Sequence, residues 1–241
     1  ASRWLQQQFA TDATLARSGA QVLGEPAAGY LSHPGYAALP KAPYRYQEML
    51  GVIWRENPSC YLQEGEQAVL LAALMETDNA GRPLIDAWIS RSGLSADAWL
   101  EKLFEATVIP FYHLLCRYGV ALIAHGQNVT LVMKDYVPQR ILLKDFQGDM
   151  RLVDEDFPQA ESLPKQVKAV TARLSADYII HDLQTGNFVT VLRFISRLTL
   201  QSGVSETRFY QILAGVLHRY MAVHPELAER FATFDLFKPQ I

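Results

Sequence analysis

Four consecutive residues, "HGQN", place His125, Gln127 and Asn128 in one short loop, and Asp145 follows Asn128 by 17 residues (145 − 128). Two apolar runs lie between Asn128 and Asp145. If these runs pair as a β-hairpin, the two side chains lie together at its open end. Amide and carboxylate oxygens suit Mg²⁺, which takes its other ligands from water and phosphate oxygens. The spacing therefore predicts a nucleotide-phosphate site with Asn128 and Asp145 as metal ligands.

Protein kinases use a similar device, in which a catalytic-loop Asn and the Asp of a D-F-G motif hold metal ions over ATP. Here "HGQN" stands where the kinase loop carries its catalytic Asp, so that base is missing and His125 or Gln127 is its nearest counterpart. This argues against phosphate transfer to a hydroxyl, although a kinase-like phosphotransferase lobe remains an alternative. A structural role is also open, because H-x-x-N loops and strand-end Asp caps are common.

The elements that must position these residues can be read from the flanking sequence. A helix is predicted over 95–119, with Ser95 as its N-cap, a kink at Pro110 and an end at Gly119. The hairpin strands are expected at 129–134 and 139–145, joined by the turn "DYVP".

The fold class is predicted to be α+β, with a small β-sheet and the hairpin beside the active-site loop, followed by a mostly helical C-terminal part. We expect a small α/β part over 1–92 and a mostly helical part over 93–241. In the first part we expect a helix over 1–18 and a loop rich in Gly and Pro over 24–43. Two apolar runs of strand length lie over 46–54 and 68–76, and the second could also be helical.

Composition excludes several classes of protein. The chain has 241 residues, 49% of them hydrophobic, and a net charge of −3, so nothing in it is basic enough to bind a phosphate backbone by charge alone. No apolar stretch is long enough to span a membrane, and no signal peptide is visible. The two cysteines, Cys60 and Cys116, have no CxxC spacing. These features predict a cytoplasmic protein without disulfides and without nucleic-acid or membrane partners.

Three stretches carry a resemblance to a known family: "APYRYQEMLGVIWRENP", "LLCRYGVALIAHGQN" and "LLKDFQGDMRL". They resemble the C-terminal half of the IucA/IucC family of siderophore synthetases, which work without a nonribosomal peptide assembly line. The resemblance implies a hand-shaped enzyme of which this chain is the palm-like part. It also implies ATP and Mg²⁺ as cofactors, an acyl-adenylate intermediate, a citrate-type substrate, a hydroxamate-bearing lysine derivative (N6-acetyl-N6-hydroxylysine) as the amine, and a homodimer as the full-length enzyme.

The family pattern assigns roles to the motif residues. By resemblance, His125 contacts the carboxylate substrate, Gln127 and Asn128 contact nucleotide or metal, and Asp145 is a metal and ATP ligand. Many members have Arg before that Asp, whereas this chain has Lys144, which keeps the positive charge but not the bidentate fork. Arg55 is a further candidate for the nucleotide cleft, with an ion pair at a strand end as the alternative.

The family's Ser-x-Arg and following Arg residues, which help to bind citrate and phosphates, lie upstream of "ASRWLQ". We therefore expect one palm domain of a longer enzyme, with little or no catalysis alone. A third reading is a reductase-like module, because iron-reductase-type proteins share some likeness to this region. An iron–sulfur reductase needs clustered thiolates, which two distant cysteines do not supply.

Several other polar residues are weighed against structural roles. Glu56 and Glu76 could face the cleft, but an ion pair or a surface position is the simpler expectation. His113 lies on an apolar helical face and is expected to be a core or rim histidine. His181 and Asp182 are adjacent on a predicted helix, where neighbouring side chains diverge, so a structural role is favoured.

Overall fold

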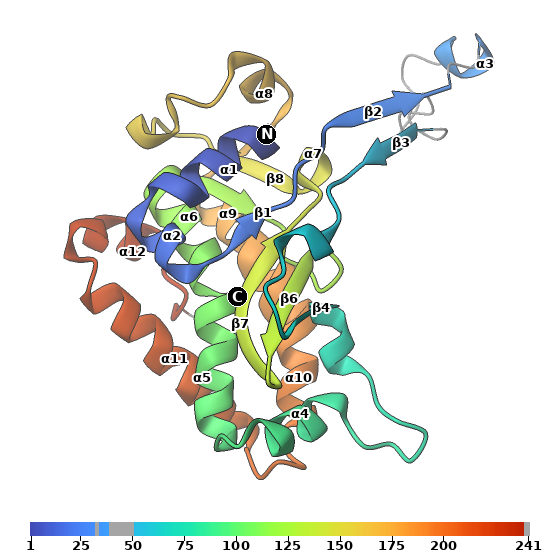
Figure 1. Ribbon diagram of the computed structural model, residues 1–241. Coiled ribbons are helices and arrows are strands. Elements are labelled where there is room, and N and C mark those ends of the chain that lie inside the picture. Colours follow the sequence, from blue (N-terminus) through green and yellow to red (C-terminus); the bar gives the residue numbers. More distant parts are fainter. Residues whose placement is uncertain (32–33, 39–50, 239–241) are drawn as a thin grey trace.

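The computed structural model describes residues 1–31, 34–38 and 51–238. Its central feature is a four-stranded sheet in the order β1-β7-β6-β4 (Figure 1). The predicted hairpin is confirmed, since β6 and β7 pair antiparallel, while β1 runs parallel to β7 and β4 antiparallel to β6. The strands of this sheet are β1 (Gln21–Val22), β4 (Glu66–Leu70), β6 (Val129–Lys134) and β7 (Val137–Leu143).

The hairpin turn is tighter than the sequence suggested. Asp135 and Tyr136 form a two-residue connection with φ of 50° and 63°, the positive values that type I′ turns require. Such turns match the right-handed twist of the strands and set the register next to the turn, and a β-bulge between Val132 and Met133 shifts the pairing by one residue toward the open end. Val129 pairs with Leu143, which leaves the HGQN loop and the KDFQG segment at the open end, as predicted.

The predicted helix 95–119 is two helices, α5 (Ala96–Thr107) and α6 (Ile109–Tyr118). Pro110 has no N–H to continue the helical hydrogen bonds, so the break falls just before it. Both predicted ends are confirmed. The Ser95 hydroxyl accepts a hydrogen bond from the Ala98 N–H at 3.2 Å, and Gly119 closes α6 with φ of 63°.

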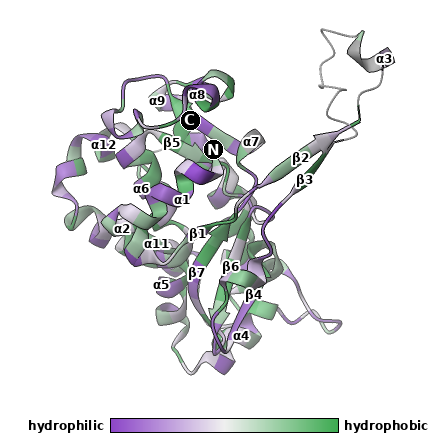
Figure 2. Ribbon diagram, turned by 45° about the horizontal axis from the view of Figure 1, so that its top comes forward, coloured by the Kyte–Doolittle hydropathy of each residue, from purple (hydrophilic) through white to green (hydrophobic). Residues whose placement is uncertain are grey.

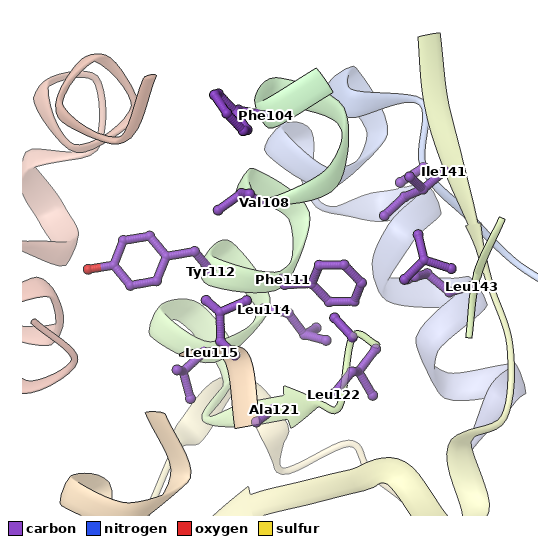
Figure 3. Packing of buried hydrophobic residues seen from close by; sticks show 14 of the residues in the cluster. Phe104, Val108, Phe111, Tyr112, Leu114, Leu115, Ala121, Leu122, Ile141 and Leu143 are labelled. Carbon is purple, nitrogen blue, oxygen red and sulfur yellow. The ribbon is translucent and has the colours of Figure 1, made fainter. Parts of the chain in front are cut away.

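The core joins α6 to the sheet that supports the site. Figure 3 shows Phe111 pointing from its helix toward Ile141 and Leu143, with Leu122 nearby. All four side chains are buried and belong to one continuous hydrophobic cluster. Burying each of them stabilises the fold by roughly 1.5–3 kcal/mol. The open end of the hairpin is therefore built on a rigid base.

A second sheet in the order β5-β8-β9 was not predicted as a unit. Its strands are β5 (Val120–Leu122), β8 (Met150–Val153) and β9 (Ala172–Leu174), and β8 runs antiparallel to β5 and parallel to β9. The N–H of Ile123 donates to the Asp149 carbonyl at 2.8 Å, which extends the pairing past β5. This sheet therefore holds the segment after Asp145 against the start of the HGQN loop.

The N-terminal part departs from the prediction at two places. The helix over 1–18 is broken into α1 (Ser2–Thr11) and α2 (Ala13–Ser18), because the Asp12 carboxylate caps α2 by accepting from the N–H groups of Thr14 and Leu15. The expected loop over 24–43 contains strand β2 (Ala27–Tyr30), which pairs with β3 (Gly51–Trp54).

Figures 1 and 2 show β2 and β3 as a two-stranded ribbon that projects from the body of the molecule. The apolar run over 68–76 is strand β4 followed by the 3₁₀ turn η3, which resolves the ambiguity of the sequence. The remaining elements are α3 (Pro34–Ala37), η2 (Pro58–Tyr61), η3 (Leu71–Met75), α4 (Leu84–Ser92), α7 (Phe146–Asp149), η4 (Pro158–Ala160), α8 (Lys165–Val170), α9 (Ala176–Leu183), the π-helix η5 (Gln184–Leu192), α10 (Arg193–Leu198), α11 (Glu206–Ala222), η6 (Pro225–Leu227) and α12 (Ala228–Thr233).

The α+β class and the mostly helical C-terminal part are confirmed. The division at 92/93 stays a prediction. Within the described ranges, no helix has the length and apolar character needed to cross a membrane.

Candidate active site

The HGQN loop is a tight turn that backbone hydrogen bonds hold in place. The N–H of Asn128 donates to the His125 carbonyl at 3.0 Å, and the Gly126 carbonyl accepts from the N–H of Ala72 at 3.0 Å. A Cβ on Gly126 would lie 3.0 Å from both the Cβ and the backbone nitrogen of Ala72, so only glycine allows this close approach. Gln127 is exposed, and His125 is one-third exposed (32% of its side chain).

The predicted juxtaposition at the hairpin end is present. The N–H of Lys144 donates to the Asn128 carbonyl at 3.2 Å, one step beyond the last strand pair. Asn128 is buried, Lys144 is half-buried and the Asp145 side chain is 43% exposed. All three line one small pocket, which they share with Asp149.

Asp149 is the residue that the sequence reading missed. Its carboxylate accepts a hydrogen bond from the side-chain amide of Asn128 and lies 3.5 Å from Nε2 of His125. One carboxylate oxygen thus faces two of the predicted site residues. A second acid four residues after Asp145 in "DFQGD" was the available signal, but the pairing of β8 with β5 is what brings Asp149 to the loop.

Arg55 lies beside Asp145 in a charged group that includes a second unpredicted residue, Glu25. The Arg55 guanidinium bonds the Glu25 carboxylate at 2.9 Å and lies 3.7 Å from the Asp145 carboxylate. Glu25 also accepts from the Asp145 N–H at 3.2 Å. Asp145 has φ of 68°, which is unusual for a residue with a side chain. The ion pairs give Arg55 a structural partner without removing it from the predicted site.

A magnesium ion needs only one or two protein oxygens when the rest come from water and phosphate. Among the described residues, no three His, Cys, Asp or Glu side chains form a metal-binding cluster. Asn128 is an amide and not one of these four residue types. Its amide nitrogen donates to Asp149, which leaves the amide oxygen as the atom that can bind another partner. Asn128 and Asp145 therefore fit an ion that arrives with a nucleotide, and not one held by a protein cage.

The remaining candidates take mostly structural roles. His113 is buried as expected, 2.8 Å from the Tyr220 hydroxyl and 3.1 Å from the Asp12 carboxylate. Glu56 accepts from the Gly24 N–H at 2.6 Å and from the Tyr61 hydroxyl, and Glu76 is exposed. The hydrogen bond from Tyr61 is the main cause that lowers the pKa of Glu56.

The sequence favours packing over a place in the cleft for Arg45 and Tyr46 and gives His33 no metal-ligand spacing; all three lie outside the described residues. Both cysteines are free; Cys60 is exposed and Cys116 is buried.

With the geometry in place, comparison with known proteins identifies the family. The profile described as "IucA / IucC family" matches residues 1–76. Aerobactin synthase of Escherichia coli is 69% identical over all 241 residues, which make up 42% of that protein. The chain belongs to the IucA/IucC family. It spans about two fifths of the length of the curated relatives that it matches.

Two further relatives of this IucA/IucC member are a solved structure and a citrate ligase. The structure of aerobactin synthetase IucC from Klebsiella pneumoniae superposes with a TM-score of 0.91 at 66% identity, covering 100% of this chain and 42% of that one. The L-2,3-diaminopropanoate–citrate ligase of Staphylococcus aureus is 34% identical over 168 residues, which cover 69% of this chain and 28% of the ligase.

A second family profile, "Ferric iron reductase FhuF-like transporter", matches residues 97–241 of the same IucA/IucC chain. This match agrees with the likeness to reductase-type proteins noted in the sequence. The chain has two cysteines, one exposed and one buried, so it does not provide the clustered thiolates of an iron–sulfur centre.

Proposed function

We propose that this chain is the palm-like part of an ATP-dependent, AMP-forming ligase of siderophore biosynthesis. The enzyme joins a citrate-type carboxylate to an N-hydroxylated amine, N6-acetyl-N6-hydroxylysine. The observation that carries the proposal is 69% identity to aerobactin synthase along the whole chain. The grouping of His125, Asn128 and Asp145 at one hairpin end supports it. Activity is assigned to the longer protein and not to this chain alone.

In the first step, a carboxylate oxygen of the citrate-type substrate attacks the α-phosphorus of ATP. The bond from that phosphorus to pyrophosphate breaks, and an acyl-adenylate forms. Asn128 and Asp145 would hold Mg²⁺, which when bound neutralises phosphate charge. Gln127, Lys144 and Arg55 contact the nucleotide in this proposal, the two cations by offsetting the negative charge of the phosphates.

In the second step, the amine nitrogen attacks the acyl carbon, the bond to AMP breaks, and an amide, AMP and a proton are released. His125 faces the reacting carboxyl group and stabilises the charge that develops on it. Asp149 orients His125 from the other side, 3.5 Å from Nε2. Asp149 is thus a positioning residue for both His125 and Asn128.

The test uses the full-length enzyme that carries this segment. It is incubated with ATP, Mg²⁺ and citrate or its mono-amide, with hydroxylamine as a surrogate nucleophile. Hydroxamate formed with release of pyrophosphate and AMP supports the ligase, whereas ADP as the nucleotide product supports the kinase-like alternative. His125→Ala and Asp145→Ala should each abolish most of the turnover. Unchanged rates in both variants would refute the site assignment.

The cellular context belongs to the same proposal. We place the full-length enzyme in the cytoplasm as a homodimer without nucleic-acid or membrane partners. Its two free cysteines suit a reducing compartment. Analytical ultracentrifugation of the full-length enzyme tests the dimer, and a monomer at micromolar concentration would contradict it.

A further inference from the structure

Glu25 and Arg55 lie at the base of the ribbon, where β2 and β3 join the body of the molecule beside α7 (Figure 1). The backbone on both sides is fixed there. The N–H of Glu56 donates to the Gly24 carbonyl at 2.9 Å, and the N–H of Gly24 donates to the Glu56 carboxylate at 2.6 Å. Glu25 follows the first of these residues and Arg55 precedes the second, so their opposite charges meet next to Asp145.

The Glu25 side chain takes over where the pairing of β1 with β7 stops. That pairing extends to Leu23, whose N–H donates to the Leu143 carbonyl at 2.9 Å. A regular parallel ladder would continue with a backbone acceptor for the N–H of Asp145. That N–H donates to Oε1 of Glu25 at 3.2 Å instead, and Asp145 has φ of 68° and ψ of 68°. Glu25 therefore holds the backbone of Asp145 at the point where it leaves the strand.

Arg55 lies between two carboxylates but is bonded to one of them. Its Nε and Nη2 both donate to Oε1 of Glu25, at 3.2 and 2.9 Å. Nη2 lies 3.7 Å from Oδ2 of Asp145, which is too far for a hydrogen bond. The Glu25 side chain is 14% exposed and that of Asp145 is 43% exposed. Two charge-assisted hydrogen bonds thus hold the guanidinium on the more buried acid.

This unequal sharing matters for a cation that approaches Asp145. A magnesium ion and a guanidinium repel each other and compete for the same carboxylate oxygens. If Glu25 lost its charge, the Arg55 guanidinium would turn to the Asp145 carboxylate, 3.7 Å away, and an arriving metal ion would have to displace it.

We propose that Glu25 is a positioning residue that keeps Arg55 off the Asp145 carboxylate, so that Asp145 is open to Mg²⁺ while Arg55 stays beside it for the phosphates. This inference rests on the proposed function and adds the residue that keeps its metal ligand and its cation apart. Glu25 acts through Arg55 and through the N–H of Asp145, without touching metal or nucleotide.

The test measures ATP binding to the full-length enzyme that carries this segment, by calorimetric titration with Mg²⁺ and again with EDTA. The readout is the factor by which Mg²⁺ strengthens ATP binding. In Glu25→Gln this factor should fall about fivefold, the strength of a partly exposed ion pair that the metal must now break. The Gln oxygen still accepts from the N–H of Asp145, so this variant removes the charge alone. Glu64→Gln removes the same charge from an exposed position before β4 and should leave the factor unchanged.

A double variant separates this role from a general effect on folding. Arg55→Gln removes the competing cation, so adding Glu25→Gln to it should change the factor by less than about twofold. A residue that only supports the fold would lower the factor equally with and without Arg55. An unchanged factor in Glu25→Gln, or an equal fall in both backgrounds, would overturn the inference. A wild-type enzyme that forms no AMP and pyrophosphate with hydroxylamine would instead refute the proposed function.

Discussion

Asp149→Ala should impair adenylation although Asp149 touches neither nucleotide nor carboxylate in the proposed mechanism. The substitution removes the acceptor for the Asn128 amide and the carboxylate that lies 3.5 Å from Nε2 of His125. Asn128 is only 5% exposed, so its amide would be left buried and unpaired. That loss is worth roughly 1–3 kcal/mol, which corresponds to about a 5- to 150-fold fall in rate.

The assay is pyrophosphate release and hydroxamate formation by the full-length enzyme, with hydroxylamine as the nucleophile. Asp149→Asn is the informative companion, since its amide oxygen can still accept from Asn128 while the negative charge facing His125 is lost. A partly exposed contact between a carboxylate and an imidazole is worth about 1 kcal/mol or less, so this variant should lose only about fivefold.

Asp154→Ala serves as the matched control. Asp154 follows the same strand, β8, but its side chain is 67% exposed and its ion pair with Arg173 is 3.7 Å long. Its rate should equal that of the wild type. If Asp149→Ala also stays within twofold of wild type while Asp145→Ala is inactive, Asp149 does not position the site and the reasoning is refuted.

Three further predictions concern stability. Burial alone would raise the pKa of Asp12, but hydrogen bonds to its carboxylate lower that pKa overall. The ionised Asp12 carboxylate therefore stabilises the fold above the ordinary carboxyl pKa, and this stabilisation is lost as pH falls through the pKa of the folded state. Asp12→Asn should unfold at lower urea concentration than wild type at pH 7, the difference should be smaller at pH 2, and a difference as large at pH 2 as at pH 7 would contradict this account. Gly119→Ala should lose roughly 2–5 kcal/mol in urea unfolding, because φ is 63° and the new Cβ would lie 2.6 Å from the Phe157 ring; wild-type stability would exclude the clash. Arg140→Met should cost about 3–5 kcal/mol by leaving the Glu66 carboxylate buried without its partner, and the double variant with Glu66→Leu should recover much of that loss in thermal unfolding.

The hairpin and its open end could be predicted because their signals are local. Two apolar runs, a short turn between them and a polar loop before the first strand predict that β6 and β7 pair as a hairpin wherever the rest of the chain goes. The caps at Ser95 and Gly119 are local in the same sense, since a side-chain hydroxyl or a missing Cβ acts within one helical turn.

The errors have a different origin, because they depend on distant partners. Strand β2 was read as loop, since Gly and Pro surround it and only pairing with β3 makes it a strand. The break at Asp12 was missed because an acid within an amphipathic pattern gives no sign that it will cap a new helix and bond His113.

The sequence by itself determined which residue types meet at the end of the hairpin, because two apolar runs joined by a short turn pair antiparallel and bring the loop before the first strand to the end of the second. Only the tertiary structure decided what surrounds them. Glu25 reaches Asp145 across 120 residues of chain, and Asp149 reaches His125 and Asn128 through the pairing of β5 with β8. Such contacts depend on how separate elements pack, and no spacing within one segment encodes that packing.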